Sequence, residues 1–348
     1  MTDPSRVPRG GPDPHRSSAV ILLYHRVTRL GSDPHGIAVN PDRFAVHLDV
    51  IASLWHPISL SELLQGLETG RIPDRAVCLT FDDGYRDNLD EAEPLLARAG
   101  IPATVFVTTG VLHTGREFWW DQLERLFLMP GSLPDRLSVR LGRGRFRATL
   151  GRAAAYDEEA AREHAEWSAR SETAPTERHT VFLRLMHRLK RLDGEARERA
   201  IDDLHEWAGS NVQSPRQTHR PLEADAVAAL AGKDAITIGA HTVSHPRLSK
   251  LPRRKRRTEI AESRTSLEEI TGASVTHFAY PFGDAARSVA AVRDAGMTAG
   301  LTTKPAAVSS GADPYLLPRI YVGDWTAEDL ETVVETRLSH PRVPGALA

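Results

Sequence analysis

Short apolar runs alternate along the chain with stretches whose apolar residues recur every three or four positions. The clearest apolar runs cover residues 19–24, 76–81, 103–108 and 235–240, and weaker ones follow at 276–280, 297–301 and 317–322. Runs that are apolar throughout predict strands covered on both faces, as in a parallel sheet. The stretches between them predict helices at 41–54, 59–67, 87–99, 223–231, 257–270, 285–295 and 326–338. The alternation predicts an α/β fold of parallel βα units with about seven strands, compatible with a barrel or an open doubly wound sheet.

The alternation is interrupted between about residues 112 and 221. No strong strand pattern occurs there, and helix-forming residues at helical spacing are found at 121–128, 153–167, 180–192 and 195–207. We therefore predict a mostly helical insertion within one domain that extends from residue 19 to residue 340. Residues 1–18 are polar and rich in proline, glycine and arginine, which predicts a flexible N-terminal tail.

Composition narrows the class of protein. Of the 348 residues, 41% are hydrophobic and 26% are charged, with a net charge of −2, so there is no general attraction to nucleic acid. No apolar stretch is long enough to span a membrane, and the N-terminus lacks the apolar segment of a secretory signal. These features predict a cytoplasmic protein. The amphipathic segment 180–192 is interpreted as a solvated helix, with peripheral membrane contact as the alternative.

Potential metal ligands follow two of the predicted strands. Asp82 and Asp83 come directly after the strand at 76–81, and His241 and His245 come directly after the strand at 235–240. Strand ends of this kind carry the sites of parallel α/β folds. Taken separately, the acids could cap a turn and the histidines could be exposed loop residues. Together, two histidines and one carboxylate leave positions open on a divalent metal, which favours a catalytic site over a closed structural one.

Five short stretches carry a resemblance to a known family. Thr80-Phe81-Asp82-Asp83-Gly84 and His241-Thr242-Val243-Ser244-His245 are similar to the first and second motifs of the polysaccharide deacetylases, the family 4 carbohydrate esterases with a nodulation-type deacetylase domain. Leu23-Tyr24-His25-Arg26-Val27, Phe278-Ala279-Tyr280-Pro281-Phe282-Gly283 and Leu317-Pro318-Arg319-Ile320 resemble further elements, the first and last of them those of the biofilm-polysaccharide branch. The resemblance covers roughly residues 19–110 and 222–325, and leaves the predicted insertion outside it.

The resemblance implies a distorted (β/α) barrel that holds a divalent metal, with zinc as the expected ion. Asp83, His241 and His245 would be the ligands, and Asp82 would be the general base in metal-assisted amide hydrolysis. The backbone N–H of Phe282 would stabilise the oxyanion. Tyr85, Tyr280 and Pro281 are the expected substrate-binding residues.

The chain departs from the wider family at two positions. Many members carry an arginine two residues before the third-motif proline, where this chain has Ala279. Arg319 could supply the same charge from a later strand, or it could be an ordinary strand-end arginine. The late histidine that serves as general acid has no counterpart, so we assign that role to His25, with a place in the core or behind the metal ligands as the alternative.

The expected function is removal of N-acetyl groups from an N-acetylated sugar, such as an oligosaccharide or an activated or lipid-linked glycan. Two alternatives remain open: an amidohydrolase acting on a small non-sugar amide, and a glycan-binding protein that has lost turnover. Two further patterns have two interpretations each. Aromatic residues 118–120 could form a sugar platform or anchor the packing of a helix. The basic run 250–257 could be a solvated face or bind an anionic part of the substrate.

Overall fold

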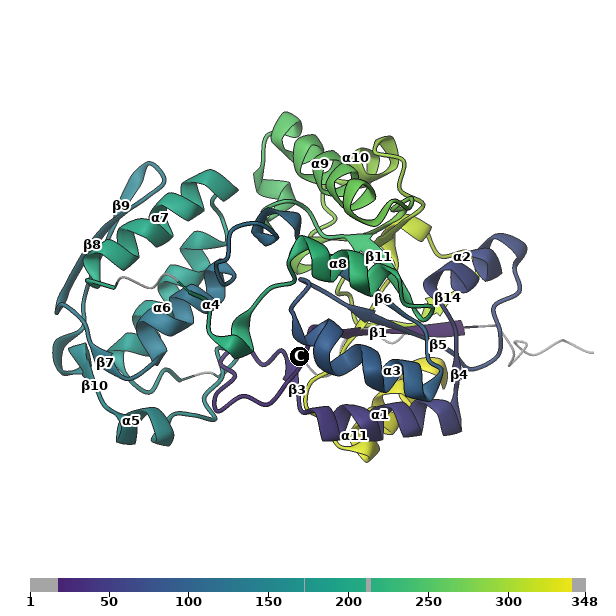
Figure 1. The fold of residues 1–348 in the computed structure, drawn as a ribbon, viewed down its shortest axis with the longest axis horizontal. Coiled ribbons are helices and arrows are strands. Elements are labelled where there is room, and N and C mark those ends of the chain that lie inside the picture. The colour runs from purple at the N-terminus through teal and green to yellow at the C-terminus, as the bar shows by residue number, and fades with distance from the viewer. Residues whose placement is uncertain (1–17, 172, 211–213, 340–348) are drawn as a thin grey trace, which may run out of the picture.

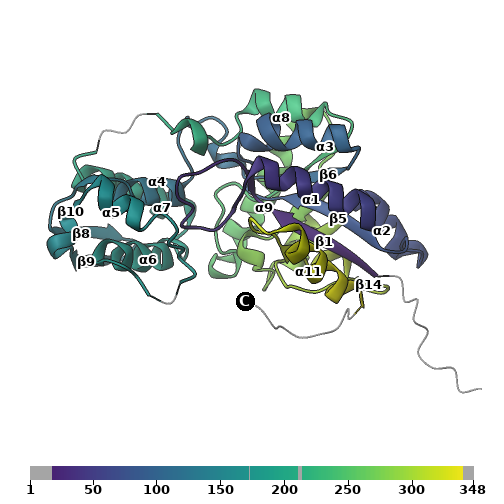
Figure 2. The same ribbon diagram turned by 90° about the horizontal axis from the view of Figure 1, so that it is seen from below.

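The computed structural model describes residues 18–171, 173–210 and 214–339. The predicted N-terminal tail lies outside these residues except for Ser18. The described chain forms two lobes, an α/β barrel and the lobe built by the insertion, which stand side by side in both views (Figures 1 and 2).

The barrel is one curled, mostly parallel sheet. Its strands run in the order β13 (Ala299–Leu301), β12 (His277–Ala279), β11 (Ile236–Ala240), β6 (Ala103–Val107), β5 (Ala76–Phe81) and β1 (Ser18–Tyr24). The short strand β15 (Ile320–Tyr321) pairs in parallel with β1, and Leu317, just before it, bridges Leu301 of β13. The sheet therefore curls back on itself through seven strands, and the prediction of a distorted (β/α) barrel is confirmed. Two further short strands pair with the N-terminal ends of the main strands. β4 (His56–Pro57) lies beside the start of β5, and antiparallel β14 (Val308–Ser309) lies beside the start of β1.

The strands are buried because they are apolar on both faces. β5 and β6 are buried along their whole length. The sheet face that packs against the helices forms the largest apolar cluster of the described residues, and the opposite face of the strands forms a separate, smaller one. Burying one leucine- or valine-sized side chain contributes about 1.5–3 kcal/mol, so a fully covered strand supplies much of the driving force for its own placement.

Helices cover the outside of the sheet, and local sequence signals set their ends. Helix α1 (Pro41–Leu54) begins after Asn40, whose side chain accepts from the Asp42 N–H. Helix α2 (Leu60–Thr69) has a capping box of Ser59 and Glu62 and ends at Gly70 in the left-handed region. The remaining barrel helices are α3 (Glu93–Ala99), α8 (Ala224–Ala231), α9 (Arg253–Thr271), α10 (Val289–Asp294) and α11 (Ala327–Ser339).

Three of the predicted barrel helices differ clearly in extent from the prediction. The helix expected at 285–295 is α10, which begins four residues later, at Val289. The helix expected at 87–99 consists of a π-helical turn at Asn88–Ala92 followed by α3. Helix α9 begins at Arg253, four residues earlier than the apolar pattern indicates, because Arg256 is buried and donates to the carbonyl oxygens of Leu248 and Leu251. A basic residue that caps neighbouring carbonyls carries no apolar signal, so periodicity misses it.

The insertion forms its own lobe with its own apolar core. Helices α4 (Trp119–Leu128), α6 (Glu177–Leu189) and α7 (Gly194–Trp207) pack around that core, as the helical pattern predicts. The segment expected as a helix at 153–167 is instead a 3-10 turn, the short strand β10 (Ala155–Tyr156), which pairs with β7 (Gly131–Ser132), and the short helix α5 (Glu158–Glu163).

A β-hairpin in this lobe is absent from the prediction. It consists of β8 (Arg136–Leu141) and β9 (Gly144–Thr149), paired antiparallel along their full length. Leu137, Val139 and Phe146 are buried, with β8 packed against α7, while the arginines of both strands are exposed. This alternation is a strand pattern of period two, but only three apolar residues carry it and it is diluted by charge. No helix of the described chain has the length and apolar character needed to cross a membrane.

Candidate active site

The two strand-end motifs meet at one edge of the barrel. Strands β5 and β11 flank β6 in the sheet, so the loops that follow them lie one strand apart. The carboxylate of Asp83 faces both histidines: its Oδ1 is 3.3 Å from His245 Nε2 and 3.5 Å from His241 Nε2. One ligand atom from each of the three residues lies within 4.8 Å of the others, and all three residues are buried. The structure thus brings together the three residues that the sequence analysis assigned as metal ligands.

Both motif loops have unusual backbone geometry. Asp83, Thr242 and His245 have φ values of 73°, 67° and 52°, the left-handed region that residues other than glycine seldom adopt. Such strain costs on the order of 1–3 kcal/mol per residue and is typical of functional sites. Hydrogen bonds hold these conformations: the Thr108 N–H donates to the Asp83 carbonyl, and the His245 N–H donates to Thr242 Oγ1.

Helix α9 supports the second motif through Glu259. Its carboxylate accepts from the backbone N–H groups of Val243 and Ser244, at 2.9 and 2.8 Å, and from the Ser244 hydroxyl. On the other side, Arg197 of α7 donates to the carbonyls of Ser244 and His245. The sequence analysis missed both residues, since each lies within a helix most of whose other charged residues are exposed.

We predict that Glu259→Gln weakens metal binding by about 10- to 100-fold, the usual effect of losing a group that orients a ligand loop. Glutamine can accept only through one oxygen and would bring an NH₂ group against two backbone donors. The affinity is measured by competition with a chelating indicator. Glu262→Gln, an exposed residue of the same helix, is the matched control and should leave the affinity unchanged. Equal affinities in the two variants would show that Glu259 does not position the ligands.

The donor set fits a divalent cation. His241 Nδ1 lies 2.8 Å from the Ala279 carbonyl oxygen, and because a carbonyl only accepts, Nδ1 donates and Nε2 is left to face Asp83. Burial lowers the pKa of His245 to about 3, so this imidazole is neutral at neutral pH. Burial favours the neutral acid of Asp83, yet the neighbouring imidazoles hold its pKa well below its usual range. A neutral imidazole and an ionised carboxylate are the protonation states that metal ligation requires.

Two carboxylates act on the protonation of His241. Burial lowers its pKa, but the carboxylates of Asp82 and Asp83 more than offset this and raise it. A proton on His241 and a metal ion at the cluster would both offset the negative charge of these carboxylates. The two therefore compete, and each weakens the binding of the other.

Asp82 and Arg319 form a buried ion pair beside the ligands. Arg319 Nη1 and Nη2 donate to the two carboxylate oxygens of Asp82, each at 2.7 Å, and Arg319 is fully buried while Asp82 is 3% exposed. Burial raises the pKa of Asp82, but Arg319 outweighs it and the net shift is downward. The guanidinium is held in turn by the Thr302 carbonyl and Thr80 Oγ1. Arg319 thus lies where it can orient Asp82, although it comes from another strand than the third motif.

His25 lies at the same edge, after β1. Burial lowers its pKa, against the opposing fields of Asp83 and Asp82, so the ring is neutral at neutral pH. Its Nδ1 is buried without a hydrogen-bond partner among the described residues, and the ring packs near Tyr321. His25 is therefore near the reacting groups with one ring nitrogen unused, and its assignment as general acid stays a prediction.

The third motif supports the site from the side of β12. Phe282 has a φ of 58°, and its ring meets the His245 ring edge-on with centroids 4.6 Å apart. The role of its N–H as an oxyanion donor stays a prediction. Tyr280 and Pro281 were expected to bind substrate, but both are buried, and the Tyr280 hydroxyl donates to the Tyr315 carbonyl. Their burial places both side chains in the core and not against substrate.

Tyr85 is a second correction. It too was expected to bind substrate, but it is fully buried and its hydroxyl donates to Asp121 of α4 and accepts from Trp120 Nε1. Trp120 packs between this tyrosine and His245, with the indole and imidazole centroids 4.9 Å apart. Tyr85 therefore joins the barrel to the insertion.

A cavity of 430 Å³ opens beside His245, between the barrel and the insertion. Its walls include Trp119 and Trp120, the backbone of the second motif, and Lys255 and Glu259 of α9. The tryptophans also belong to the apolar core of the insertion, so they serve as packing anchors and as one wall of this cavity.

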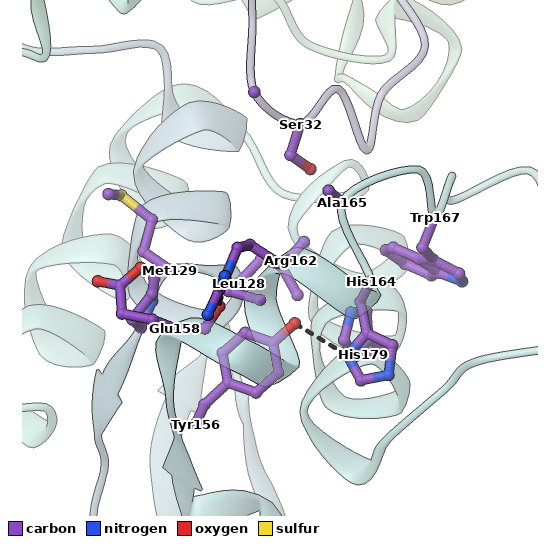
Figure 3. Close-up of a pocket in the computed structure, with 13 residues that line it drawn as sticks. Ser32, Leu128, Met129, Tyr156, Glu158, Arg162, His164, Ala165, Trp167 and His179 are labelled. Atoms are coloured by element: carbon purple, nitrogen blue, oxygen red, sulfur yellow. Dashed lines mark hydrogen bonds between the residues drawn. The ribbon is translucent and has the colours of Figure 1, made fainter.

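A second cavity, of 230 Å³, lies within the insertion against the loop before β3 (Figure 3). Tyr156, His164 and His179 form one of its walls, and the Tyr156 hydroxyl contacts His164 Nδ1 at 3.0 Å. None of the predicted site residues lines it.

Three of the six basic residues of the run 250–257 are engaged with other parts of the protein. Arg256 caps carbonyls of the preceding loop, Lys255 pairs with Asp193 of the insertion, and Arg257 pairs with Asp294. These pairs favour the structural interpretation of the run over an anion-binding one.

Comparison with known proteins agrees with this geometry. The model of the polysaccharide deacetylase family matches residues 69–130 and 204–300, which include both strand-end motifs and the third motif. YxkH of Bacillus subtilis (strain 168), a protein named for the same family, is 30% identical over 89 residues. That alignment spans 25% of this chain and 30% of YxkH.

Solved structures share the fold over almost the whole chain. The Streptococcus pyogenes deacetylase PplD, solved in complex with acetate, has a TM-score of 0.53 at 17% identity and covers 91% of this chain and 98% of its own. IcaB from Ammonifex degensii has a TM-score of 0.54 at 17% identity, with 92% and 97% covered. The BpsB deacetylase domain from Bordetella bronchiseptica has a TM-score of 0.51 at 16% identity, with 89% and 98% covered. The chain thus carries a polysaccharide deacetylase domain, with all three motifs inside the matched segments.

Proposed function

We propose that this protein hydrolyses the N-acetyl group of an N-acetylated sugar. The observation that carries the proposal is the convergence of Asp83, His241 and His245 beside the Asp82–Arg319 pair, at the carboxyl edge of a deacetylase barrel. The polysaccharide deacetylase domain supports a glycan as substrate.

The residues at this edge divide into a metal-binding set and a proton-handling set. Asp83, His241 and His245 would hold a divalent ion, for which zinc suits the two imidazoles and one carboxylate best. When bound, such an ion supplies Lewis acidity toward the amide oxygen and lowers the pKa of a bound water.

Asp82 is the proposed general base. Arg319 keeps it ionised and fixes the plane of its carboxylate, so a lone pair remains available toward the space in front of Asp83. After it takes the proton of the attacking water, the leaving amine must receive one. His25 is the proposed donor because, besides the ligand histidines, it is the titratable ring in the field of both carboxylates among the described residues. Since the ring is neutral at rest, it must first take up the proton that Asp82 removes from the water and then give it to the amine.

The cavity beside His245 is the proposed place for the sugar. Its 430 Å³ fits a mono- or disaccharide-sized group better than a long chain. Trp119 and Trp120 offer aromatic surface, and Lys255, Glu198 and Glu259 offer polar groups around its rim.

Of the alternatives, loss of turnover is the less favoured. It relied on the missing third-motif arginine and the missing late histidine, and Arg319 supplies the charge of the first to Asp82 directly. A small non-sugar amide remains the second candidate, since the same hydrolytic groups would cleave any acetamide that fits the cavity.

Acetate release from N-acetylglucosamine and its short oligomers, compared with linear and cyclic amides, tests the proposal. We expect release from the sugars only, abolished by a chelator and restored by one equivalent of zinc per site. Cleavage confined to non-sugar amides would overturn the assignment of substrate. Activity that persists after complete metal removal would overturn the assignment of the ligands.

A further inference from the structure

A second set of potential metal ligands lies in the seam between the barrel and the insertion. His35 comes from the loop between β2 (Arg26–Val27) and β3 (Ala38–Val39), and Asp121 and Glu124 lie one turn apart on α4. One ligand atom from each residue lies within 4.8 Å of the others, and His35 Nε2 is 3.4 Å from Glu124 Oε2. In Figure 1 the purple loop before β3 reaches out from the barrel toward the lobe that contains α4.

Several buried polar atoms in this seam have no hydrogen-bond partner among the described residues. Asp121 is 1% exposed, and its Oδ2 accepts from the Tyr85 hydroxyl, but its Oδ1 has no hydrogen-bond partner among the described residues. His35 Nε2 and the neighbouring His219 Nε2 are buried and unpartnered by the same criterion. The two imidazole nitrogens lie 3.4 and 3.5 Å from oxygens of Glu124, within ion-pair range, so Asp121 Oδ1 is the atom left without any partner among the described residues. Leaving such an atom unsatisfied costs about 1–3 kcal/mol, which indicates that a further group belongs beside it.

Among the described residues, no positively charged side chain forms an ion pair with the Asp121 carboxylate. Arg216 forms ion pairs with Glu117 and Glu124, and Arg26 forms one with Asp87. Arg216 reaches only the backbone carbonyl of Asp121, and no ion pair to the Asp121 carboxylate is found among the described residues. Burial, reinforced by the nearby Glu124 carboxylate, raises the pKa of Asp121 despite the opposing field of His219. A bound cation would remove this cost.

The spacing resembles that of the active-site ligands. Two ligands about 2.0–2.1 Å from one tetrahedral zinc ion lie roughly 3.3 Å apart. The His35–Glu124 separation of 3.4 Å is close to this value, and so is the His245–Asp83 separation of 3.3 Å. His219 faces the other oxygen of Glu124, at 3.5 Å, which Arg216 already shares, so we treat it as a neighbour of the cluster.

We propose that His35, Asp121 and Glu124 bind a second divalent transition-metal ion, of the zinc class, that fastens the insertion to the barrel. The role is structural: the three ligands come from both lobes, and none of them lines the cavity beside His245. Its effect reaches the active site through Asp121, which holds the Tyr85 hydroxyl, and through Trp120, which joins Tyr85 to His245. Fixing α4 in this way fixes one wall of the cavity.

The test isolates the second ion by removing the first site. In the full-length Asp83→Ala/His241→Ala protein, bound zinc is counted by elemental analysis after dialysis, and thermal unfolding is followed with and without added zinc. We expect one equivalent of zinc to remain and zinc to raise the Tm. Adding His35→Ala and Asp121→Asn should abolish both effects, whereas adding His187→Ala, an exposed residue of α6, should abolish neither.

A spectroscopic measurement avoids dependence on variants that fold poorly. Cobalt(II) titrated into the Asp83→Ala/His241→Ala protein, with the seam intact, should give the visible absorption of a low-coordinate site with nitrogen and oxygen ligands. No retained zinc, no shift in Tm and no cobalt absorption would together overturn the proposal. None of these readouts requires acetate release, so the second site can fail while the deacetylase assignment stands, and the reverse.

Discussion

Replacing Asp82 with asparagine is expected to lower kcat for acetate release by about 10²- to 10⁴-fold, the range contributed by a general base. The amide keeps the shape of the carboxylate and one acceptor oxygen for Arg319, but it cannot take a proton from water. Because Asp82 is not one of the three proposed ligands, the metal content should stay near the wild-type value. The measurement is steady-state acetate release together with elemental analysis of the same preparation.

A second buried aspartate–arginine pair provides the control. Asp87 accepts from Arg26 Nε at 3.1 Å and from the Val27 N–H, and both side chains are at least nine-tenths buried. Asp87→Asn weakens a similar pair outside the reacting groups, so it should cost stability with little change in kcat. If Asp82→Asn and Asp87→Asn lose similar fractions of activity, Asp82 is a structural residue and the proposed mechanism is wrong.

Arg319→Met is expected to reduce the free energy of unfolding by about 3–5 kcal/mol, because it leaves a buried carboxylate without its partner. The sign of the pH effect follows from the pKa of Asp82. With Arg319 present, that pKa is lowered, so the pair stabilises the fold above the unfolded-state pKa, and this contribution is lost as pH falls through the lower folded-state value.

Without Arg319, burial acts on Asp82 with less opposition and raises its pKa. The acid limb of the kcat profile should therefore move to higher pH in Arg319→Met, a shift that simple loss of stability would not produce. Arg319→Lys keeps the charge but loses the two-pronged contact, so its limb should lie between those of Arg319→Met and the wild type. If the acid limb stays in place in both variants, Arg319 does not set the pKa of Asp82 during catalysis.

The barrel and the ligand cluster could be predicted because their signals are local. Continuous apolar runs specify the strands, and Asp83, His241 and His245 stand directly at strand ends, where parallel topology brings such residues to one edge. The pairing of Arg319 with Asp82 could only be suspected, because it depends on how β15 returns beside β1. That return is a property of sheet closure, which no single segment encodes.

The errors have a common physical origin. Tyr85, Tyr280 and Pro281 were placed against substrate because they adjoin motif residues, yet a neighbour along a strand end points the opposite way as often as the same way. The β8–β9 hairpin was missed because arginines occupy its solvent face. The seam cluster was invisible because His35 and Glu124 are far apart in sequence and meet only when two lobes pack.

The position of the insertion has an evolutionary consequence. Its chain leaves the barrel after β6 and returns before β11, and these two strands are hydrogen-bonded neighbours over five paired positions. The sheet therefore fixes the distance between β6 and β11, whatever sequence lies in the insertion between them. Evolution could change the sequence of the insertion, and with it the preferred glycan, while the hydrolytic groups kept their positions.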